Sequence, residues 1–267
     1  MLVGMARGSG RGSRLLPLLL IVAVVGAAVA FSHVRADAAR PGGMVVLYGD
    51  SLSTESSPYF ADELARTTSA LVITKPIPGT APCSVLDTMR NDATIHPDVV
   101  VIQYVGNNGA SCTRDANGQP LTGQALADRY EADVRAATDM FAAEGTNVVL
   151  VGGPDAPGLP GGATMQIVDV YHKIVDEWDA RAFGRVRYAD AAGTVTGPDH
   201  QFVDKLPCAS DEGPGQGCTD GEVEVRSPDR AHFCPATGAY MVCPVPSPGA
   251  RRFGFEMAQV ARDALND

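Results

Sequence analysis

Basic residues are scarce in this chain. Its 267 residues include 21 Lys and Arg against 31 Asp and Glu, which gives a net charge of −10 at pH 7. Four of the 21 bases and one of the 31 acids lie in residues 1–38, so residues 39–267 hold 17 bases and 30 acids, a net charge of −13. This excess of negative charge argues against nucleic acid and against an anionic lipid surface as partners.

Long apolar runs are rare, and the clearest one covers residues 15–31. Arg7, Arg11 and Arg14 precede it without any acid, and small residues that suit cleavage follow at 28–30 and 36–38. This order predicts a secretory signal. Because such a run can reach the ~17–25 residues that cross a bilayer, an uncleaved N-terminal membrane anchor is the alternative. Either way, we expect residues 39–267 to form one domain that is secreted or lies in the cell envelope.

Signatures of a zinc site are missing as well. The chain has no Cys-x-x-Cys sequence and no two histidines at helical spacing, which are common arrangements of zinc ligands. We therefore expect no metal. An even number of cysteines in an exported chain indicates disulfides instead. The six cysteines are Cys83, Cys112, Cys208, Cys218, Cys234 and Cys243.

Apolar runs that suit strands alternate with amphipathic stretches that suit helices. Strands are predicted at 44–48, 70–74, 99–105, 148–151 and 186–189, and helices within 126–141, 167–178 and 252–265. Ser57-Pro58 predicts the start of an earlier helix, as a cap and a first-turn proline. Residues 152–162 and 196–228 are predicted loops. The alternation indicates an α/β protein whose parallel sheet is covered on both faces.

The most informative motif is Gly49-Asp50-Ser51-Leu52, directly after the first predicted strand. A serine at such a turn presents its hydroxyl at the end of a buried strand, where a nucleophile is useful. The alternative is an ordinary turn into a helix, because Asp and Ser are favoured as caps.

Three further sites follow along the chain. Gly79 lies after the second predicted strand, and Asn108 lies in Gly106-Asn107-Asn108-Gly109 after the third. Asp229 and His232 form an Asp-x-x-His sequence near the C-terminus. Taken singly, Asn108 and Gly79 could be turn residues, and a lone histidine is usually structural.

In this order, the four sites resemble the blocks of the SGNH hydrolases, or GDSL esterases, over about residues 43–267. The resemblance implies a three-layer α/β/α sandwich with a mainly five-stranded parallel sheet of flavodoxin-like type. It implies Ser51 as nucleophile, His232 as general base and Asp229 as the acceptor that orients the imidazole. The backbone N–H groups of Ser51 and Gly79, with the Asn108 amide, would form an oxyanion hole. Such a set is chemically complete for acyl transfer.

Two positions depart from the family pattern. Position 109 is Gly where the family often has Asp. This puts in doubt how well the turn that contains Asn108 is held in place. Arg230 lies between Asp229 and His232, where relatives often have glycine, and we expect its side chain to face solvent.

Cysteine spacing suggests one set of disulfides among the 15 pairings that six cysteines allow. Cys83 follows Gly79 by four residues, and Cys112 follows Asn108 by four, so a Cys83–Cys112 bridge would tie the two oxyanion loops together. The remaining pairs would be Cys208–Cys218 and Cys234–Cys243.

The sequence thus predicts an exported serine esterase that needs no cofactor and cleaves a small-molecule, glycan or lipid ester, O-acetyl esters among them. Two alternatives stay open: a cell-envelope O-acyltransferase with the same residues, and a non-catalytic envelope-binding protein. A long apolar insertion resembling a lipase lid is absent from the sequence.

Overall fold

Five parallel strands form the central sheet of the computed structural model, which describes residues 42–181, 184–236 and 243–267. Their order across the sheet is β2-β1-β3-β4-β5. The strands are β1 Met44–Gly49, β2 Leu71–Pro76, β3 Val99–Gln103, β4 Asn147–Val151 and β5 Val186–Ala189. The predicted strands are therefore confirmed, with the third ending two residues earlier than expected.

The register brings the carboxyl ends of the strands to one level. Gly49 at the end of β1 pairs with Pro76 of β2 and with Gln103 of β3. Gln103 in turn pairs with Val151 of β4, and Val151 with Ala189 of β5. Ligands of open parallel sheets bind outside this edge, so the loops that follow the strands are where a site is expected.

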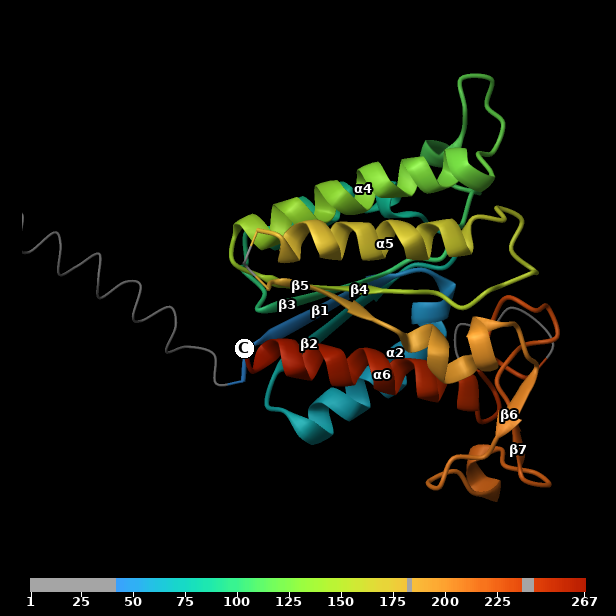
Figure 1. Cartoon of the computed structure of the whole chain (residues 1–267). Helices are drawn as coiled ribbons and strands as arrows, with labels where there is room; N and C mark the ends of the chain where they lie inside the picture. Colours follow the sequence, from blue (N-terminus) through green and yellow to red (C-terminus); the bar gives the residue numbers. More distant parts are fainter. Residues whose placement is uncertain (1–41, 182–183, 237–242) are drawn as a thin grey trace, which may run out of the picture. The chain divides into compact units, whose positions relative to one another are not determined.

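Helices cover both faces of the sheet (Figure 1). Side chains of β1 alternate between two hydrophobic cores, with Val46 and Tyr48 in one and Val45 and Leu47 in the other. On the first face pack α3 Leu86–Ala93, α4 Gly123–Ala143 and α5 Thr164–Asp179, and on the second α2 Ser51–Thr67 and α6 Pro248–Leu265. The three-layer α/β/α fold, with the flavodoxin-like strand order, is confirmed.

The helices α2 and α6 lie close together on the second face. Gly254 of α6 has no room for a side chain, because the Ser56 carbonyl and the Phe60 amide of α2 lie against it. This close approach fixes the start of the last helix next to the helix that Ser51 begins.

The prediction that this helix begins at Ser57-Pro58 is wrong. α2 begins at Ser51 with Asp50 as its N-cap, and Pro58 lies inside it. Proline has no N–H, so it leaves the carbonyl one turn before it, that of Thr54, without a helical partner. The Ser57 hydroxyl donates to that carbonyl at 3.3 Å, which compensates the loss and lets the helix continue.

Long connections follow β4 and β5. Residues 152–162 contain no helix or strand, as predicted. The excursion at 196–228 also carries a small antiparallel pair, β6 Lys205–Pro207 and β7 Glu222–Glu224. Short helical turns are η1 Pro82–Ser84, η2 Ser111–Thr113, η3 Ala191–Val195, η4 Pro198–His200 and η5 Pro214–Gln216.

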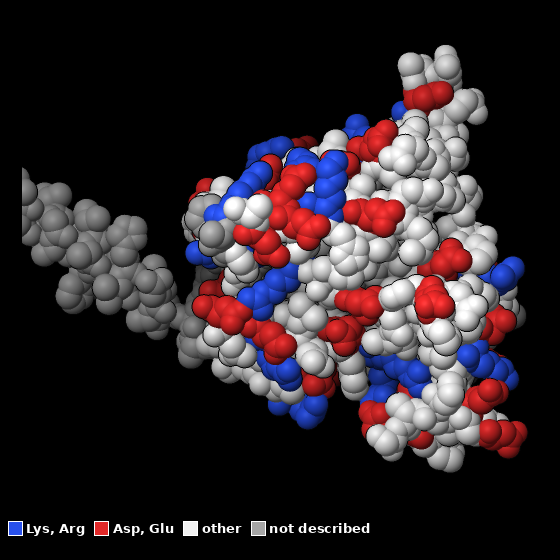
Figure 2. Space-filling model, in the orientation of Figure 1, with Lys and Arg blue, Asp and Glu red and all other residues white. Residues whose placement is uncertain are grey.

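Acidic and basic side chains are interspersed on the face that Figure 2 draws. On α4 and α5, Arg135 pairs with Glu131 at 2.9 Å and also with Glu177, while Lys173 pairs with Glu131 at 2.7 Å. These ion pairs join the two outer helices, although such exposed pairs each contribute only about 0–1 kcal/mol.

The expected signal or anchor, residues 1–38, lies outside the described part of the chain. None of the helices in the described part combines the length and the apolar character needed to cross a membrane.

Candidate active site

Ser51 lies at the turn where β1 passes into α2. Asp50 caps the helix, its Oδ1 accepting a hydrogen bond from the Leu52 N–H at 3.0 Å. A side chain at Gly49 would collide with the Ser53 side chain and the Gln103 carbonyl, so the turn requires glycine at this position. The Gly-Asp-Ser sequence therefore brings a half-buried serine to the carboxyl ends of the strands.

The Asp50 carboxylate connects this turn to the loop after β3. Its Oδ2 accepts from the Val105 N–H at 2.9 Å and from the Asn107 side-chain amide at 3.2 Å. Burial raises the pKa of Asp50 to about 6, although hydrogen bonds from the Val105 and Leu52 amides act in the opposite direction. Sequence reasoning treated Asp50 as a cap only, and the structure shows that it also positions the third motif.

Gly79 and Asn108 are on the two neighbouring loops. Gly79 follows β2 and has φ +72°, a conformation that favours glycine. Asn108 is buried, and its Nδ2 donates to the Leu121 carbonyl at 3.0 Å. An amide nitrogen carries two hydrogens, so this bond fixes the side chain and leaves a second donor.

A disulfide joins these two loops, as predicted from the cysteine spacing. Cys83 is bonded to Cys112, with 6.2 Å between their Cα atoms. The other two predicted pairs, Cys208–Cys218 and Cys234–Cys243, are confirmed as well.

Asp229 and His232 form a tight pair. His232 Nδ1 lies 2.6 Å from Asp229 Oδ2, while Oδ1 accepts from the Ala231 and His232 backbone N–H groups at 2.9 and 3.0 Å. Partial burial acts to raise the pKa of Asp229, but hydrogen bonds from the His232 ring and from these amides lower it to about 2. An ionised Asp229 favours the tautomer of a neutral His232 ring that carries its proton on Nδ1, which leaves Nε2 as a hydrogen-bond acceptor.

Arg230, between these two residues, adopts φ +61° and is exposed, as expected. Its guanidinium lies 4.7 Å from the centre of the Phe202 ring. A cation over an aromatic face is favourable, so this contact supports the bend in the loop.

Glu55 links the His232 loop to the helix of Ser51. It lies four residues after Ser51, hence on the same face of α2, and is buried. Its Oε2 accepts from the Phe233 N–H at 2.7 Å. Burial raises the pKa of Glu55, opposed chiefly by this hydrogen bond and by the electrostatic effect of the nearby His232 ring. Sequence reasoning missed Glu55, and a carboxylate one turn after the candidate nucleophile was the available signal.

Two more hydrogen bonds hold the same loop. The Ser227 N–H donates to the His232 carbonyl at 2.8 Å, and the Ser247 hydroxyl, at the start of α6, donates to the Phe233 carbonyl at 3.1 Å. The backbone on both sides of the His232 ring is therefore anchored to its surroundings.

The structure brings the motif residues to one edge of the sheet but leaves one contact unmade. Within the described residues, the Ser51 hydroxyl forms no hydrogen bond to the His232 ring, and the two are connected through Glu55 and Phe233 instead. Catalytic hydrogen bonds are often long until substrate binds. No group of three or more His, Cys, Asp or Glu residues in the described part could hold a metal ion.

Comparison with known proteins gives a likeness of structure alone. No protein-family model and no curated protein sequence matches the chain. A provisionally assigned acylhydrolase of Bacteroides fragilis is 16% identical and superimposes with a TM-score of 0.53, over 84% of this chain and 88% of its own. LAE5, an alpha/beta hydrolase enzyme from the metagenome of Lake Arreo, is 14% identical with a TM-score of 0.50, over 85% of this chain and 98% of its own.

A GDSL-like lipase of Bacteroides thetaiotaomicron is 16% identical, with a TM-score of 0.47 over 74% of this chain and 88% of its own. At such identities a likeness extends to the fold and no further. The chain therefore shares with the acylhydrolase and with LAE5 an α/β fold, here a five-stranded parallel sheet between layers of helices.

Proposed function

We propose that this protein is an exported serine esterase that hydrolyses carboxylic esters through an acyl-enzyme on Ser51. The observation that carries the proposal is the 2.6 Å pair of Asp229 and His232 on a loop whose Phe233 amide is bound by Glu55. Glu55 lies on the helix that Ser51 begins, so one rigid element supports both the nucleophile and the base.

In the first half-reaction the Ser51 oxygen attacks the ester carbonyl carbon, and His232 Nε2 takes the hydroxyl proton. The negative charge that develops on the carbonyl oxygen is met by the N–H groups of Ser51 and Gly79 and by the Asn108 amide. The alcohol leaves with the proton from His232, and Ser51 keeps the acyl group. Water then attacks that acyl group, His232 takes a proton from the water, and the acid departs as the proton returns to Ser51.

Export is supported by residues 1–38 and by the cysteines. All six are paired in disulfides, which persist in oxidising compartments. Determining the N-terminus of the mature protein tests this part, with cleavage near residues 36–38 expected and an intact Met1 in the membrane fraction indicating an anchor.

A series of p-nitrophenyl esters from acetate to palmitate, with protein lacking residues 1–38, tests the activity. We expect hydrolysis by the wild type and none by Ser51→Ala. Incubation of the wild type with a reactive phosphonate ester should give a phosphonate adduct on Ser51. Thr67→Ala removes an exposed hydroxyl at the end of the same helix that bonds only the Glu63 carbonyl; it is the matched control and should stay active. Acyl transfer to an added alcohol in preference to water would indicate a transferase. Absence of both turnover and labelling would refute catalysis by Ser51.

A further inference from the structure

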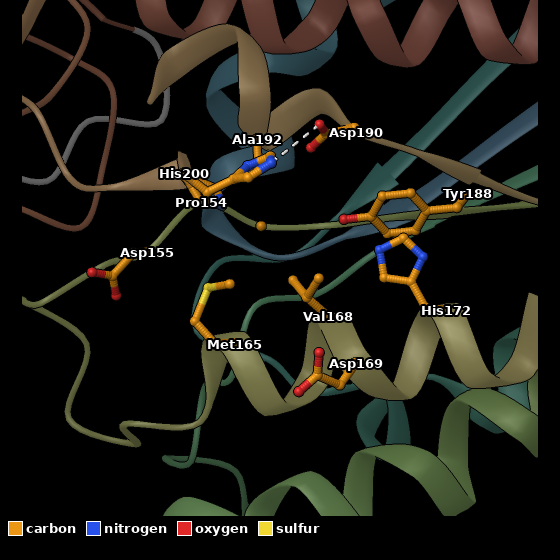
Figure 3. A pocket seen from close by; sticks show the side chains of 11 residues that line it. Pro154, Asp155, Met165, Val168, Asp169, His172, Tyr188, Asp190, Ala192 and His200 are labelled. Atoms are coloured by element: carbon orange, nitrogen blue, oxygen red, sulfur yellow. Dashed lines mark ion pairs between the residues drawn. The ribbon is translucent and has the colours of Figure 1, made fainter. Parts of the chain in front are cut away.

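A cavity of about 340 Å³ opens at the carboxyl ends of β4 and β5 (Figure 3). One stripe of α5 forms one side, with Met165 and Val168 directed into the hollow, and Tyr188 from β5 forms another. The loop after β4 and the turns η3 and η4 complete the walls. Neither Ser51 nor His232 lines the cavity, so it is separate from the candidate catalytic residues.

Two neighbouring glycines give this cavity its shape. A side chain at Gly152 would collide with the Tyr188 hydroxyl, and one at Gly153 would collide with Val105. The His172 ring packs on Tyr188, with 3.9 Å between the ring centres. The stacked rings of His172 and Tyr188, packed against the glycine backbone, therefore form a rigid wall beside the apolar side chains of Met165 and Val168.

Apart from two histidines, the ionisable groups around the cavity are carboxylates, which accept hydrogen bonds when ionised. Asp155, Asp169 and Asp190 line it, accompanied by His172 and His200, and its lining includes no Lys or Arg. His200 Nε2 lies 3.7 Å from Asp190 Oδ2. Carboxylates repel anionic ligands and accept hydrogen bonds from hydroxyl groups. A ligand rich in hydroxyl donors and free of negative charge is therefore the chemical match.

Cationic alcohols fit less well than sugars. Binding of a quaternary ammonium group relies on an open aromatic face, and His172 covers a face of Tyr188, the aromatic residue that lines this cavity. A sugar ring instead offers apolar C–H groups for Met165 and Val168 and hydroxyls for the aspartates.

The cavity is connected to the His232 loop through the segment after β4. The Arg226 guanidinium donates from Nη2 to the Asp155 carbonyl at 2.9 Å. Gly158 of the same segment lies against the Asp229 carbonyl, leaving no space for a side chain. β4 is two strands from β1, which at about 4.8 Å per strand is roughly 10 Å. An alcohol part that extends about this far from an ester at Ser51 would span the distance between the two strands.

We propose that this cavity binds the sugar part of a glycan O-acyl ester whose acyl group is transferred to Ser51. The inference rests on the proposed esterase function and adds the class of alcohol that the enzyme accepts.

The test compares three acetate esters: p-nitrophenyl acetate, acetylated cellobiose and acetylcholine. Val168→Trp fills the cavity and Asp169→Asn removes one acceptor charge. Each should raise KM for acetylated cellobiose by about tenfold, a binding loss of about 1.4 kcal/mol, and leave p-nitrophenyl acetate hydrolysis unchanged. Asp176→Asn makes the same charge change at an exposed position of α5 outside the cavity and is the control.

The outcomes separate the two proposals. A wild type that cleaves none of the p-nitrophenyl esters refutes the esterase function itself. A wild type that is active, with variants that change neither substrate or both equally, refutes only the role of the cavity. A selective loss of acetylcholine hydrolysis would replace the sugar by a cationic alcohol and also overturn the inference. Titration calorimetry of cellobiose into Ser51→Ala, with and without Val168→Trp, measures the binding apart from catalysis.

Discussion

Single hydrogen bonds determine the relative positions of the segments that form this site. The pair formed by Asp229 and His232 is local, three residues apart, and would form on almost any tight loop. The bond from the Phe233 amide to Glu55 spans 178 residues. It is the contact that links the His232 loop to the helix of Ser51. We therefore expect its removal to lower the rate of hydrolysis more than the loss of one ordinary hydrogen bond would.

Glu55→Ala is expected to lower kcat by about ten- to a hundredfold with little change in KM, because small displacements of a catalytic group are costly. Glu55→Gln keeps an acceptor oxygen and should lose less. Steady-state kinetics with p-nitrophenyl acetate measures both. Glu63→Ala, on the same helix and paired with the exposed Arg66, serves as control. A lower melting temperature with unchanged kcat would show that Glu55 only stabilises the fold.

Asn108→Ala should reduce kcat by about 10²–10³, the effect of losing one oxyanion donor. The measurement is the rate of acylation by a p-nitrophenyl ester, with circular dichroism to verify folding. Asn117→Ala, in an exposed turn, is the comparison. A loss of less than about threefold would exclude Asn108 from the oxyanion hole.

At the residue scale, the sequence predicts candidates for the chemistry but not the contacts between them. Ser51, Asp229 and His232 could be proposed because each lies in a short motif. The partners of Asp50 and Glu55 could not be found, since Val105 and Phe233 lie 55 and 178 residues away and only folding brings them near.

Elements were predictable where a periodic pattern is long. The strands of the sheet and the helices α4, α5 and α6 follow their apolar repeats, and the Cys83–Cys112 disulfide followed from equal spacing after two motifs. The start of α2 was misplaced because Ser57-Pro58 matches a helix start. The bond from the Ser57 hydroxyl to the Thr54 carbonyl, which lets the helix pass through proline, is a detail that no pattern indicates.

The disulfide between the two oxyanion loops should support catalysis as well as stability. Cys83→Ser/Cys112→Ser opens a bridge of sequence separation 29, and chain entropy predicts a loss of about 3–4 kcal/mol in unfolding free energy. We also expect kcat to fall, because Gly79 and Asn108 are no longer tied together. Denaturant unfolding and ester kinetics measure the two effects.

Cys208→Ser/Cys218→Ser is the matched control, because it opens a bridge of separation 10 in the excursion after β5. It should lose about 3 kcal/mol and retain kcat. Equal activity in the two double variants would contradict a role of the first bridge in the site.

For the whole molecule, two aspartates give opposite pH dependences of stability. The pKa of Asp229 in the folded state, about 2, lies below the ordinary value of about 3.9. Its contribution to the free energy of unfolding is complete above about pH 4 and is lost as the pH falls towards 2. The pKa of Asp50, about 6, lies above the ordinary value, so its contribution is complete below about pH 4 and is lost as the pH rises through 6.

The variant Asp50→Asn tests the direction of the pH dependence that is expected from Asp50. Between pH 4 and 6 the wild type should lose roughly 2–3 kcal/mol from this buried group, and the variant should lack that part of the slope. Guanidinium unfolding at half-unit pH steps gives both curves. If the curves of unfolding free energy against pH for the wild type and the variant were parallel between pH 4 and 6, the pKa of Asp50 would not be raised by burial.

The helix α6 also holds the His232 loop in place. Phe233 packs on Phe253 of α6, with 5.0 Å between the ring centres, while Ser247 at the start of α6 bonds the Phe233 carbonyl. The position of the His232 ring therefore depends on two helices, on α2 through Glu55 and on α6 through Ser247 and Phe253.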